Sequence, residues 1–198
     1  MDKITWTHPG IAHILDAIPN EARSLLDVGC GGGVIGALCR IYRSMDRLVG
    51  VDAHAPAIEL CRRHSFYDEV LDLDITADRL PFADSSFDVV TCIEVIEHVG
   101  REDGLRLLDE LERVGRSVIV TTPNGYLEQD DLEGNPLQRH LSGWSVGDFA
   151  RRGYRVQGIG GMRIFGGHRR YISSALGPVT RYLPRLSELL LSRKTVAG

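Results

Sequence analysis

The sequence lacks any apolar run long enough to span a membrane, and its first residues lack the apolar stretch of a signal peptide. Its cysteines show no C-x-x-C spacing, and each falls in an apolar strand or helix pattern. They are Cys30, Cys39, Cys61 and Cys92. Reduced, buried thiols of this kind are typical of a reducing compartment, so the sequence predicts a cytoplasmic protein.

Internal repeats and low-complexity linkers are also missing, which argues against a repeat architecture or a string of domains. The chain has 198 residues, of which 43% are hydrophobic and 25% are charged. This composition is ordinary for a globular protein, and the length is enough for one full core. We therefore expect residues 1–198 to form a single domain.

Apolar strand patterns alternate with amphipathic helix patterns along the chain. Strands are expected at Ser24–Cys30, Arg47–Ala53, Glu69–Ile75, Phe87–Ile93, Ser117–Thr122, Tyr154–Ile159 and Glu188–Lys194. Helices are expected at His8–Ile18, Val34–Tyr42, Pro56–Ser65, Glu102–Val114 and Val146–Arg152. Apolar strands between amphipathic helices indicate βαβ units, so the predicted fold class is α/β, with a doubly wound and mostly parallel sheet.

The run Leu25-Leu26-Asp27-Val28-Gly29-Cys30-Gly31-Gly32-Gly33 is a short strand that ends in an acid and breaks into glycines. Glycines allow a tight turn and a close approach of ligand to backbone, so a ligand is expected there. Gly31-x-Gly33-x-x-Gly36 formally fits the dinucleotide fingerprint, which favours an NAD-dependent oxidoreductase. Asp27 disfavours it, because a pyrophosphate binds bare N–H groups and is repelled by a carboxylate.

A ligand with a cationic amino-acid end, a ribose and an adenine suits the acids better. Asp27, Asp52 and Asp74 each follow an expected strand. We expect Asp27 to lie near an ammonium group, directly or through water, Asp52 to accept the ribose hydroxyls, and Asp74 to accept from the adenine amine. One acid at a strand end is explained by a helix N-cap, but three at successive strand ends favour S-adenosylmethionine.

The glycine-rich turn, Val49-Gly50-Val51-Asp52 and Leu80-Pro81-Phe82 through Val90 resemble the class I S-adenosylmethionine-dependent methyltransferases. Glu94-Val95-Ile96-Glu97-His98 and Thr121-Thr122-Pro123-Asn124 are similar to the branch that contains ubiquinone-biosynthesis O-methyltransferases and small-RNA 2′-O-methyltransferases. The resemblance implies a Rossmann-like seven-stranded sheet with an antiparallel last strand. It also implies a cofactor site of Asp27, Gly29, Cys30, Gly31, Gly33, Asp52, Ala53, Asp74, Ile75, Ile93 and Glu94.

The same resemblance divides the domain into an N-terminal cap helix (1–20), a cofactor-binding core (21–124) and an acceptor-side part (125–198). Trp6 and the cap helix are expected to cover the cofactor cleft. The Asn135–Trp144 segment, with many polar groups beside a tryptophan, suggests a substrate-facing loop. A loop held by its own hydrogen bonds, with Ser145 as a helix N-cap, is the alternative.

The side chains of Glu94, Glu97 and His98 share one face if they lie on one helical turn. With His140 they offer a ligand set for Mg²⁺, Mn²⁺ or Zn²⁺, a pattern that the small-RNA methyltransferases use. The alternative is a structural role for Glu97 and His98, with Glu94 beside the cofactor. In either case His140 and Glu94 are the candidate catalytic residues, with His140 as a base that deprotonates the acceptor.

The predicted function is methyl transfer to an oxygen, nitrogen or carbon nucleophile. A catalytically silent cofactor-binding partner subunit is the alternative. Up to Gln138 the chain has 12 basic residues against 25 acidic ones, and from Arg139 onward 11 against 2. This asymmetry is explained by a solvated basic face or by an anionic acceptor, such as a metabolite, nucleic acid or a membrane surface. Arg169, Arg170, Tyr171, Ile172, Leu176 and Val179 are candidates for a lid or a membrane contact.

Overall fold

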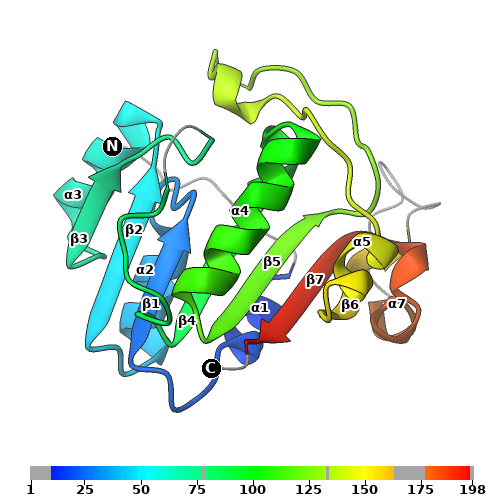
Figure 1. The fold of residues 1–198 in the computed structure, drawn as a ribbon, viewed down its shortest axis with the longest axis horizontal. Helices are drawn as coiled ribbons and strands as arrows, with labels where there is room; N and C mark the ends of the chain where they lie inside the picture. The colour runs from blue at the N-terminus through cyan, green and yellow to red at the C-terminus, as the bar shows by residue number, and fades with distance from the viewer. Residues whose placement is uncertain (1–9, 77–78, 133, 163–176, 197–198) are drawn as a thin grey trace.

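The computed structural model describes residues 10–76, 79–132, 134–162 and 177–196, and it contains one seven-stranded sheet (Figure 1). The strands are β1 (Ser24–Val28), β2 (Arg47–Asp52), β3 (Glu69–Asp72), β4 (Val89–Ile93), β5 (Ser117–Pro123), β6 (Arg155–Met162) and β7 (Ser187–Thr195). Their order in the sheet is β3-β2-β1-β4-β5-β7-β6. Strand β7 is antiparallel to both of its neighbours, while the remaining pairs are parallel, as predicted.

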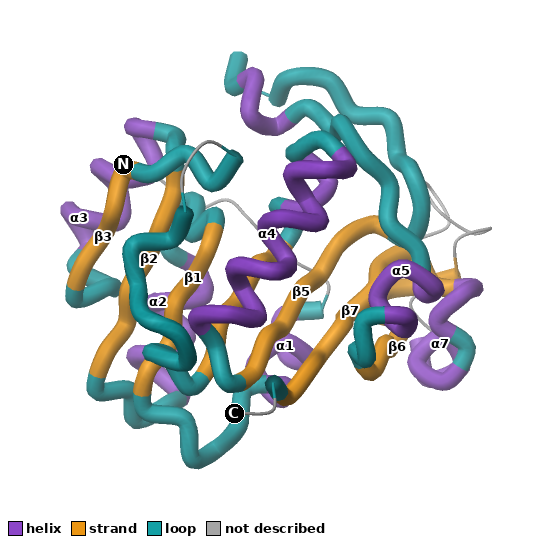
Figure 2. The backbone as a smooth tube through the Cα atoms, viewed as in Figure 1, coloured by secondary structure: helices purple, strands orange, loops and turns teal. Residues whose placement is uncertain are grey.

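Helices cover both faces of this sheet (Figure 2). They are α1 (Ile11–Ala17), α2 (Val34–Tyr42), α3 (Ala55–His64), α4 (Arg101–Val114), α5 (Val146–Arg151) and α7 (Gly177–Tyr182), with 3₁₀ turns η1 (Ile96–His98), η2 (Pro136–Gln138) and η5 (Pro184–Leu186). Helices α1, α2 and α3 bury apolar side chains in one core cluster, and α4 and α5 do so in the other. The sheet is therefore doubly wound, as the alternation of patterns predicted.

The strands divide their side chains between the two clusters by simple alternation. In β1, Leu25 belongs to the cluster of α1 and α2, whereas Leu26 belongs to the cluster of α4. In β5, Ile119 faces the first cluster while Val118 and Val120 face the second. Strands buried on both faces need apolar residues at nearly every position, which explains why these segments read as continuous apolar runs.

Several strands end earlier than their apolar patterns predicted. Strand β1 stops at Val28, because Gly29 has a φ of 73° and turns the chain out of the sheet. Strand β3 stops at Asp72 rather than Ile75, and Phe87 forms only an isolated bridge before β4. The residues predicted to end β3, Leu73–Ile75, belong instead to a loop that lines a cavity.

Strands β1 and β4 are neighbours, although β2 and β3 lie between them in sequence. The chain therefore winds outward in one direction from β1 and in the other from β4, and a crevice forms at their carboxyl ends. Helix α1, the described part of the predicted cap helix, buries Ile14 and Ala17 against the core and lines no part of this crevice. Trp6 lies outside the described residues. None of the described helices is long and apolar enough to cross a membrane.

Candidate active site

A cavity of about 410 Å³ lies in this crevice, at the carboxyl ends of β1, β2 and β4. The predicted cofactor residues that line it are Gly29, Gly31, Asp52, Ala53, Asp74, Ile75 and Glu94. They come from four successive strand ends, which the parallel sheet brings to one edge. Of the three acids expected at strand ends, Asp52 and Asp74 line this one cavity together with Glu94, whereas Asp27 does not.

The glycine turn after β1 has a shape that other residues do not adopt without strain. Gly29, Gly31 and Gly33 have φ values of 73°, 50° and 85°. A Cβ atom on Gly29 would also lie 2.2 Å from Cγ2 of Val95, which itself lines the cavity. These glycines are therefore needed for the left-handed backbone and, at Gly29, for close packing.

Two carboxylates of the cavity wall are oriented by backbone N–H groups. Asp52 Oδ2 accepts from the N–H of Gly31 at 2.8 Å, and Oδ1 accepts from the N–H of His54 at 2.8 Å. Asp74 Oδ1 accepts from the N–H and the hydroxyl of Thr76. Because each carboxylate oxygen has two acceptor sites, both side chains retain capacity for the hydroxyl or amine donors of a nucleoside.

Asp27, Cys30, Gly33 and Ile93, also predicted to bind the cofactor, do not line the cavity. Asp27 is 1% exposed, and its two oxygens accept from the hydroxyls of Tyr67 at 2.5 Å and Thr91 at 2.7 Å. Burial raises the pKa of Asp27 to about 6, while both hydroxyls act to lower it. Its influence on a ligand therefore has to act through the glycine turn that covers it.

The predicted metal ligands form a smaller cluster than expected. One ligand atom each from Glu97, His98 and His140 lies within 4.8 Å of the other two. Glu94 does not join them: it has a φ of 54° and precedes η1, so it is not on one helical turn with Glu97 and His98. A left-handed residue at this point redirects its side chain to the cavity wall, where Glu94 is found.

Backbone carbonyls orient both histidine rings of this cluster. His98 Nδ1 lies 3.2 Å from the carbonyl oxygen of Arg139, and His140 Nδ1 lies 2.6 Å from that of Leu127. A carbonyl can only accept, so in the neutral rings Nδ1 carries the proton and Nε2 keeps a free lone pair. Burial lowers the pKa of His98, which favours this neutral form.

Glu97 completes the cluster as a buried acid. It is 2% exposed, and among the described residues its Oε2 has no hydrogen-bond partner. Burial, followed by the nearby Glu94, raises the pKa of Glu97 well above its usual range. A buried carboxylate oxygen without a donor is costly, and a cation would supply the missing partner. His140 does not line the cavity itself and contacts it through His98, whose ring centroid is 4.8 Å away.

The 135–144 loop lines the cavity with some residues and is held by its own hydrogen bonds through others. Asn135, Gln138 and Leu141 line the cavity, so one side of the loop faces this space. Trp144 does not: it is 1% exposed, and its Nε1 donates to Ser142 Oγ at 2.9 Å. The tryptophan holds the loop in the core instead of contacting substrate.

The start of the following helix also matches the structural alternative. The hydroxyl and the N–H of Ser145 both donate to Asp148, which closes a capping box at the first turn of α5. The polar residues of this region therefore have different roles: Asn135 and Gln138 line the cavity, whereas Ser145 begins a helix.

Sequence reasoning missed part of the wall. His54, which no sequence pattern assigned to the site, lines the cavity, as do Val99 just before α4 and Asp103 in its first turn. Asp103 belongs to the first helical turn, where an acid is ordinarily explained by the helix dipole, so the sequence held no separate signal for it.

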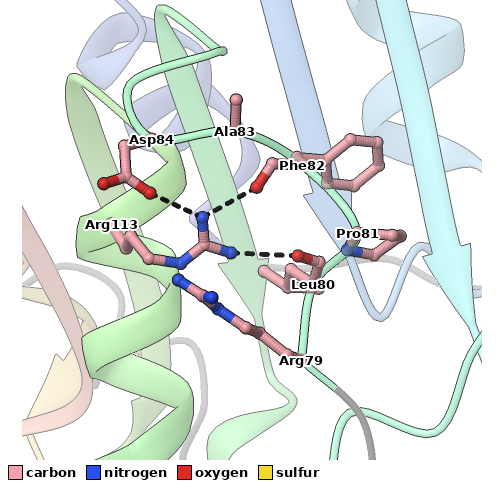
Figure 3. Close-up of a pocket in the computed structure, with 7 residues that line it drawn as sticks. All are labelled: Arg79, Leu80, Pro81, Phe82, Ala83, Asp84 and Arg113. Atoms are coloured by element: carbon pink, nitrogen blue, oxygen red, sulfur yellow. Dashed lines mark hydrogen bonds and ion pairs between the residues drawn. The ribbon is translucent and has the colours of Figure 1, made fainter.

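A second hollow, of about 470 Å³, is lined by residues 79–84 and Arg113 (Figure 3). Arg113 is 15% exposed and reaches from α4 into this loop. It donates to the carbonyls of Leu80 and Phe82 and to Asp84 at 2.7–2.9 Å, and its partner Glu110 lies on the same helix. With its donors committed to the protein, this arginine holds the loop before β4, and we assign the hollow a structural role.

Comparison with known proteins agrees with this geometry. Residues 26–119 match the family model described as a methyltransferase domain. The ubiquinone biosynthesis O-methyltransferase of Schizosaccharomyces pombe is 35% identical over 111 residues, which cover 51% of this chain and 38% of that protein. That of Brucella anthropi is 36% identical over 115 residues, which cover 56% and 45%. The chain thus spans less than half the length of these curated relatives.

Solved structures share the fold at low sequence identity. A Haloferax volcanii methyltransferase in complex with the Trm112 methyltransferase activator superposes with a TM-score of 0.65 at 18% identity, covering 95% of this chain and 89% of that one. The methyltransferase domain of bacterial CtHen1 superposes with a TM-score of 0.63 at 20% identity, covering 95% of each chain. At these identities the likeness describes the fold alone.

The sheet order, the glycine turn and the acid-lined crevice are those of an α/β protein of the Rossmann-like kind. Over residues 26–119 the chain matches a methyltransferase domain, and the class I S-adenosylmethionine-dependent methyltransferases are the proteins that it is similar to in sequence and in fold.

Proposed function

We propose that the protein transfers the methyl group of S-adenosylmethionine to a nucleophilic atom of an acceptor that lies between Glu94 and the 135–141 loop. The observation that carries this proposal is a single cavity with two kinds of wall. Asp52 and Asp74 provide carboxylates for a nucleoside, while Glu94, His98 and Gln138 provide polar groups for a second molecule. The O-methyltransferase names of the curated relatives support oxygen as the accepting atom.

When bound, the cofactor supplies a methyl group on a positively charged sulfur, which is a good neutral leaving group. The chain then has to align the acceptor and exclude water. Asp52 would accept both ribose hydroxyls, and Asp74 the adenine amine. The glycine turn allows the methionine part to lie against the backbone, because no Cβ atoms protrude from it. Glu94, at the end of β4, would border the reacting atoms.

The Glu97, His98 and His140 cluster fits a divalent cation. Two neutral imidazoles with free Nε2 lone pairs and one buried carboxylate oxygen form a donor set that suits Mg²⁺, Mn²⁺ or Zn²⁺. Such an ion would act as a Lewis acid toward an acceptor hydroxyl. Should the cluster hold no ion, His140 Nε2 is the base or orienting group of the site, acting through His98.

We propose that the 177–186 segment, which comprises α7 and η5, binds the negatively charged group of the acceptor. Much of the basic charge after Arg139 is paired elsewhere, since Arg152 and Lys194 contact Asp109 and Glu112 of α4. Arg181 and Arg185 of the segment have no ion-pair partner among the described residues. They are therefore the available cations of this region.

Position and exposure support that assignment. The Asn124 side chain, just after β5, donates to the carbonyls of Pro184 and Arg185, so the segment lies at the edge of the sheet where the strands open into the cavity. Tyr182 and Leu183 beside the arginines are 80% and 52% exposed. Of the residues predicted to form a lid, Val179 lies on α7, while Arg169, Arg170, Tyr171, Ile172 and Leu176 fall outside the described residues.

Calorimetry tests the cofactor assignment. We expect the purified chain to bind S-adenosylmethionine and S-adenosylhomocysteine but not NAD, because the acid-lined wall repels a pyrophosphate. Methyl transfer from labelled S-adenosylmethionine to a panel of oxygen, nitrogen and carbon nucleophiles then tests the activity. Tight binding of NAD without any response to S-adenosylhomocysteine would contradict the proposal.

Metal analysis tests the cluster. After chelation and refilling, we expect one divalent ion per chain and a raised melting temperature, both lost in His140→Ala. His54→Ala is the matched control, since His54 lines the cavity outside the cluster. No stoichiometric ion, together with activity that survives a chelator, would leave His140 as a base or orienting group.

Salt titration tests the anionic acceptor. Exposed charges are screened over about 8–10 Å at physiological ionic strength, so added salt should raise the Michaelis constant for the acceptor. Arg181→Gln with Arg185→Gln should do the same and leave cofactor affinity unchanged. Turnover of a neutral acceptor that is insensitive to both changes would contradict this part of the proposal.

A further inference from the structure

Tyr67 lies outside the cavity but connects the two elements that flank the glycine turn. Its hydroxyl donates to Asp27 Oδ2 at 2.5 Å and accepts from the N–H of Gly36 at 3.2 Å. Asp27 belongs to β1, just before the turn, and Gly36 to the first turn of α2, just after it. One buried hydroxyl therefore ties together both ends of the backbone that the proposed cofactor would contact.

The Tyr67 ring explains glycines that do not face the cavity. A Cβ atom on Gly36 would lie 2.6 Å from the ring Cζ, and one on Gly50 would lie 3.2 Å from Cδ2. Neither glycine lines the cavity. The Gly36 position, which completed the dinucleotide fingerprint in the sequence, is therefore glycine because a tyrosine ring packs against it, and not because a phosphate binds there.

Asp27 is a buried carboxylate held by hydroxyls alone. Its other oxygen accepts from Thr91, and it forms no ion pair with a described Lys or Arg residue. The titratable groups around it are Asp52 on β2 and the thiols of Cys30, Cys39, Cys61 and Cys92. Asp52 raises the pKa of Asp27, whereas the Tyr67 hydroxyl lowers it. Burial and Asp27 raise the pKa of Tyr67 itself, so its hydroxyl remains a donor at neutral pH.

We propose that Tyr67 is a positioning residue for cofactor binding, whose hydroxyl keeps the Asp27 carboxylate ionised and in place beneath the glycine turn. The inference rests on the proposed function, in which a ligand with an ammonium group lies against that turn. A negative charge under the turn favours such a ligand, and a neutral Asp27 does not. The hydroxyl therefore matters most at pH values where Asp27 would otherwise take up a proton.

The experiment is S-adenosylhomocysteine binding by calorimetry from pH 6.0 to 8.5, in wild type and Tyr67→Phe. The variant keeps the ring that packs against Gly36 and Gly50. Losing one donor raises the pKa of Asp27, and one pKa unit corresponds to about a tenfold change between protonation states. At pH 6.0, near the Asp27 pKa of about 6, a rise of one unit lowers the ionised fraction about fivefold, so we expect Tyr67→Phe to weaken binding about fivefold there and much less at pH 8.5. The ligand's own titration is common to both proteins and cancels in the ratio of dissociation constants.

Two further variants distinguish positioning from stability. Tyr154→Phe is the matched control, since Tyr154 is a buried tyrosine in the other core cluster, and it should leave the binding ratio at one. In an Asp27→Asn background, Tyr67→Phe should no longer change the pH dependence. A ratio that stays constant with pH, or a Tyr67→Phe protein that melts earlier but binds normally, overturns the inference. Failure of wild type to bind at any pH would instead contradict the proposed function, and the inference with it.

Discussion

Asp52→Ala is the most informative single substitution in the cavity. The carboxylate accepts backbone N–H groups from Gly31 and His54, both at 2.8 Å, so its orientation is set before any ligand arrives. In the proposed complex it also accepts the two ribose hydroxyls. Hydrogen bonds to a charged group contribute about 1.5–3 kcal/mol. The variant should therefore bind S-adenosylhomocysteine roughly 10- to 150-fold more weakly.

The same substitution should also lower the free energy of unfolding, which is an effect separate from the loss of binding. Two backbone N–H groups lose an acceptor, at a cost of about 1 kcal/mol each when solvent replaces it only in part. For a chain of this size, that corresponds to a fall in melting temperature of roughly 4–8 °C. Asp52→Asn should retain part of both effects, because one side-chain oxygen is still an acceptor.

Calorimetry with S-adenosylhomocysteine and a thermal melt measure the two effects independently. Asp72→Ala is the matched control: it removes an exposed acid from the end of β3 that does not line the cavity, so binding should be unchanged. Wild-type affinity in Asp52→Ala would refute the assignment of this wall to the ribose. A melting temperature that falls while affinity stays constant would assign the carboxylate to the turn alone.

Three further predictions concern the supports of the site. Arg113→Ala should lower the free energy of unfolding by about 2–4 kcal/mol in urea titrations, because the carbonyls of Leu80 and Phe82 and the Glu110 carboxylate lose a charged donor. Arg106→Ala on the same helix should have little effect. Equal effects of the two substitutions would contradict the role of Arg113. The Asp27 pKa of about 6 in the folded protein lies above its unfolded value of about 3.9. Protonation of Asp27 therefore contributes to the stability of the folded protein in full below pH 4, and this contribution is lost by pH 7. The free energy of unfolding of Asp27→Asn relative to wild type should therefore rise by about 3 kcal/mol over that range, and a constant difference would contradict the raised pKa. Gly29 has a φ of 73°, and a Cβ atom there would lie 2.2 Å from Val95, so Gly29→Ala should cost about 1–2 kcal/mol of stability from backbone strain alone and should weaken S-adenosylhomocysteine binding. Gly134 has a φ of 77° with open space around it, so Gly134→Ala should show the same strain without the loss of binding. Identical behaviour of the two variants would refute the packing argument.

The position of several residues of the cavity wall could be predicted, because they follow strands. Asp52 and Asp74 come directly after apolar segments, and parallel strands bring their carboxyl ends to one edge. The location of these acids therefore needed only the alternation of strand and helix patterns. Glu94 was assigned to the right wall but also to the wrong cluster, because its left-handed backbone is a local conformation that residue spacing does not reveal.

The acceptor side was less predictable, because its contacts join distant segments. Trp144 looked like a substrate contact in a polar loop, but its ring is buried and receives Arg101 over one face at 3.9 Å. That packing depends on how the loop returns to α4. The convergence of His98 with His140 was predicted from residue chemistry and family resemblance, while the orientation of the two rings depends on the carbonyls of Arg139 and Leu127.

The sequence by itself determined the order of elements, the two-faced burial of the sheet and the edge at which the acids gather. These features follow from short-range periodicity and from glycines with no side chain, which are local properties of the chain. Only the tertiary structure decided that the Asp27 carboxylate accepts from the hydroxyl of Tyr67, forty residues later in the chain. Such a contact arises from the packing of β1, α2 and the segment that precedes β3. The residue pattern within any one of these segments does not encode how close it lies to another.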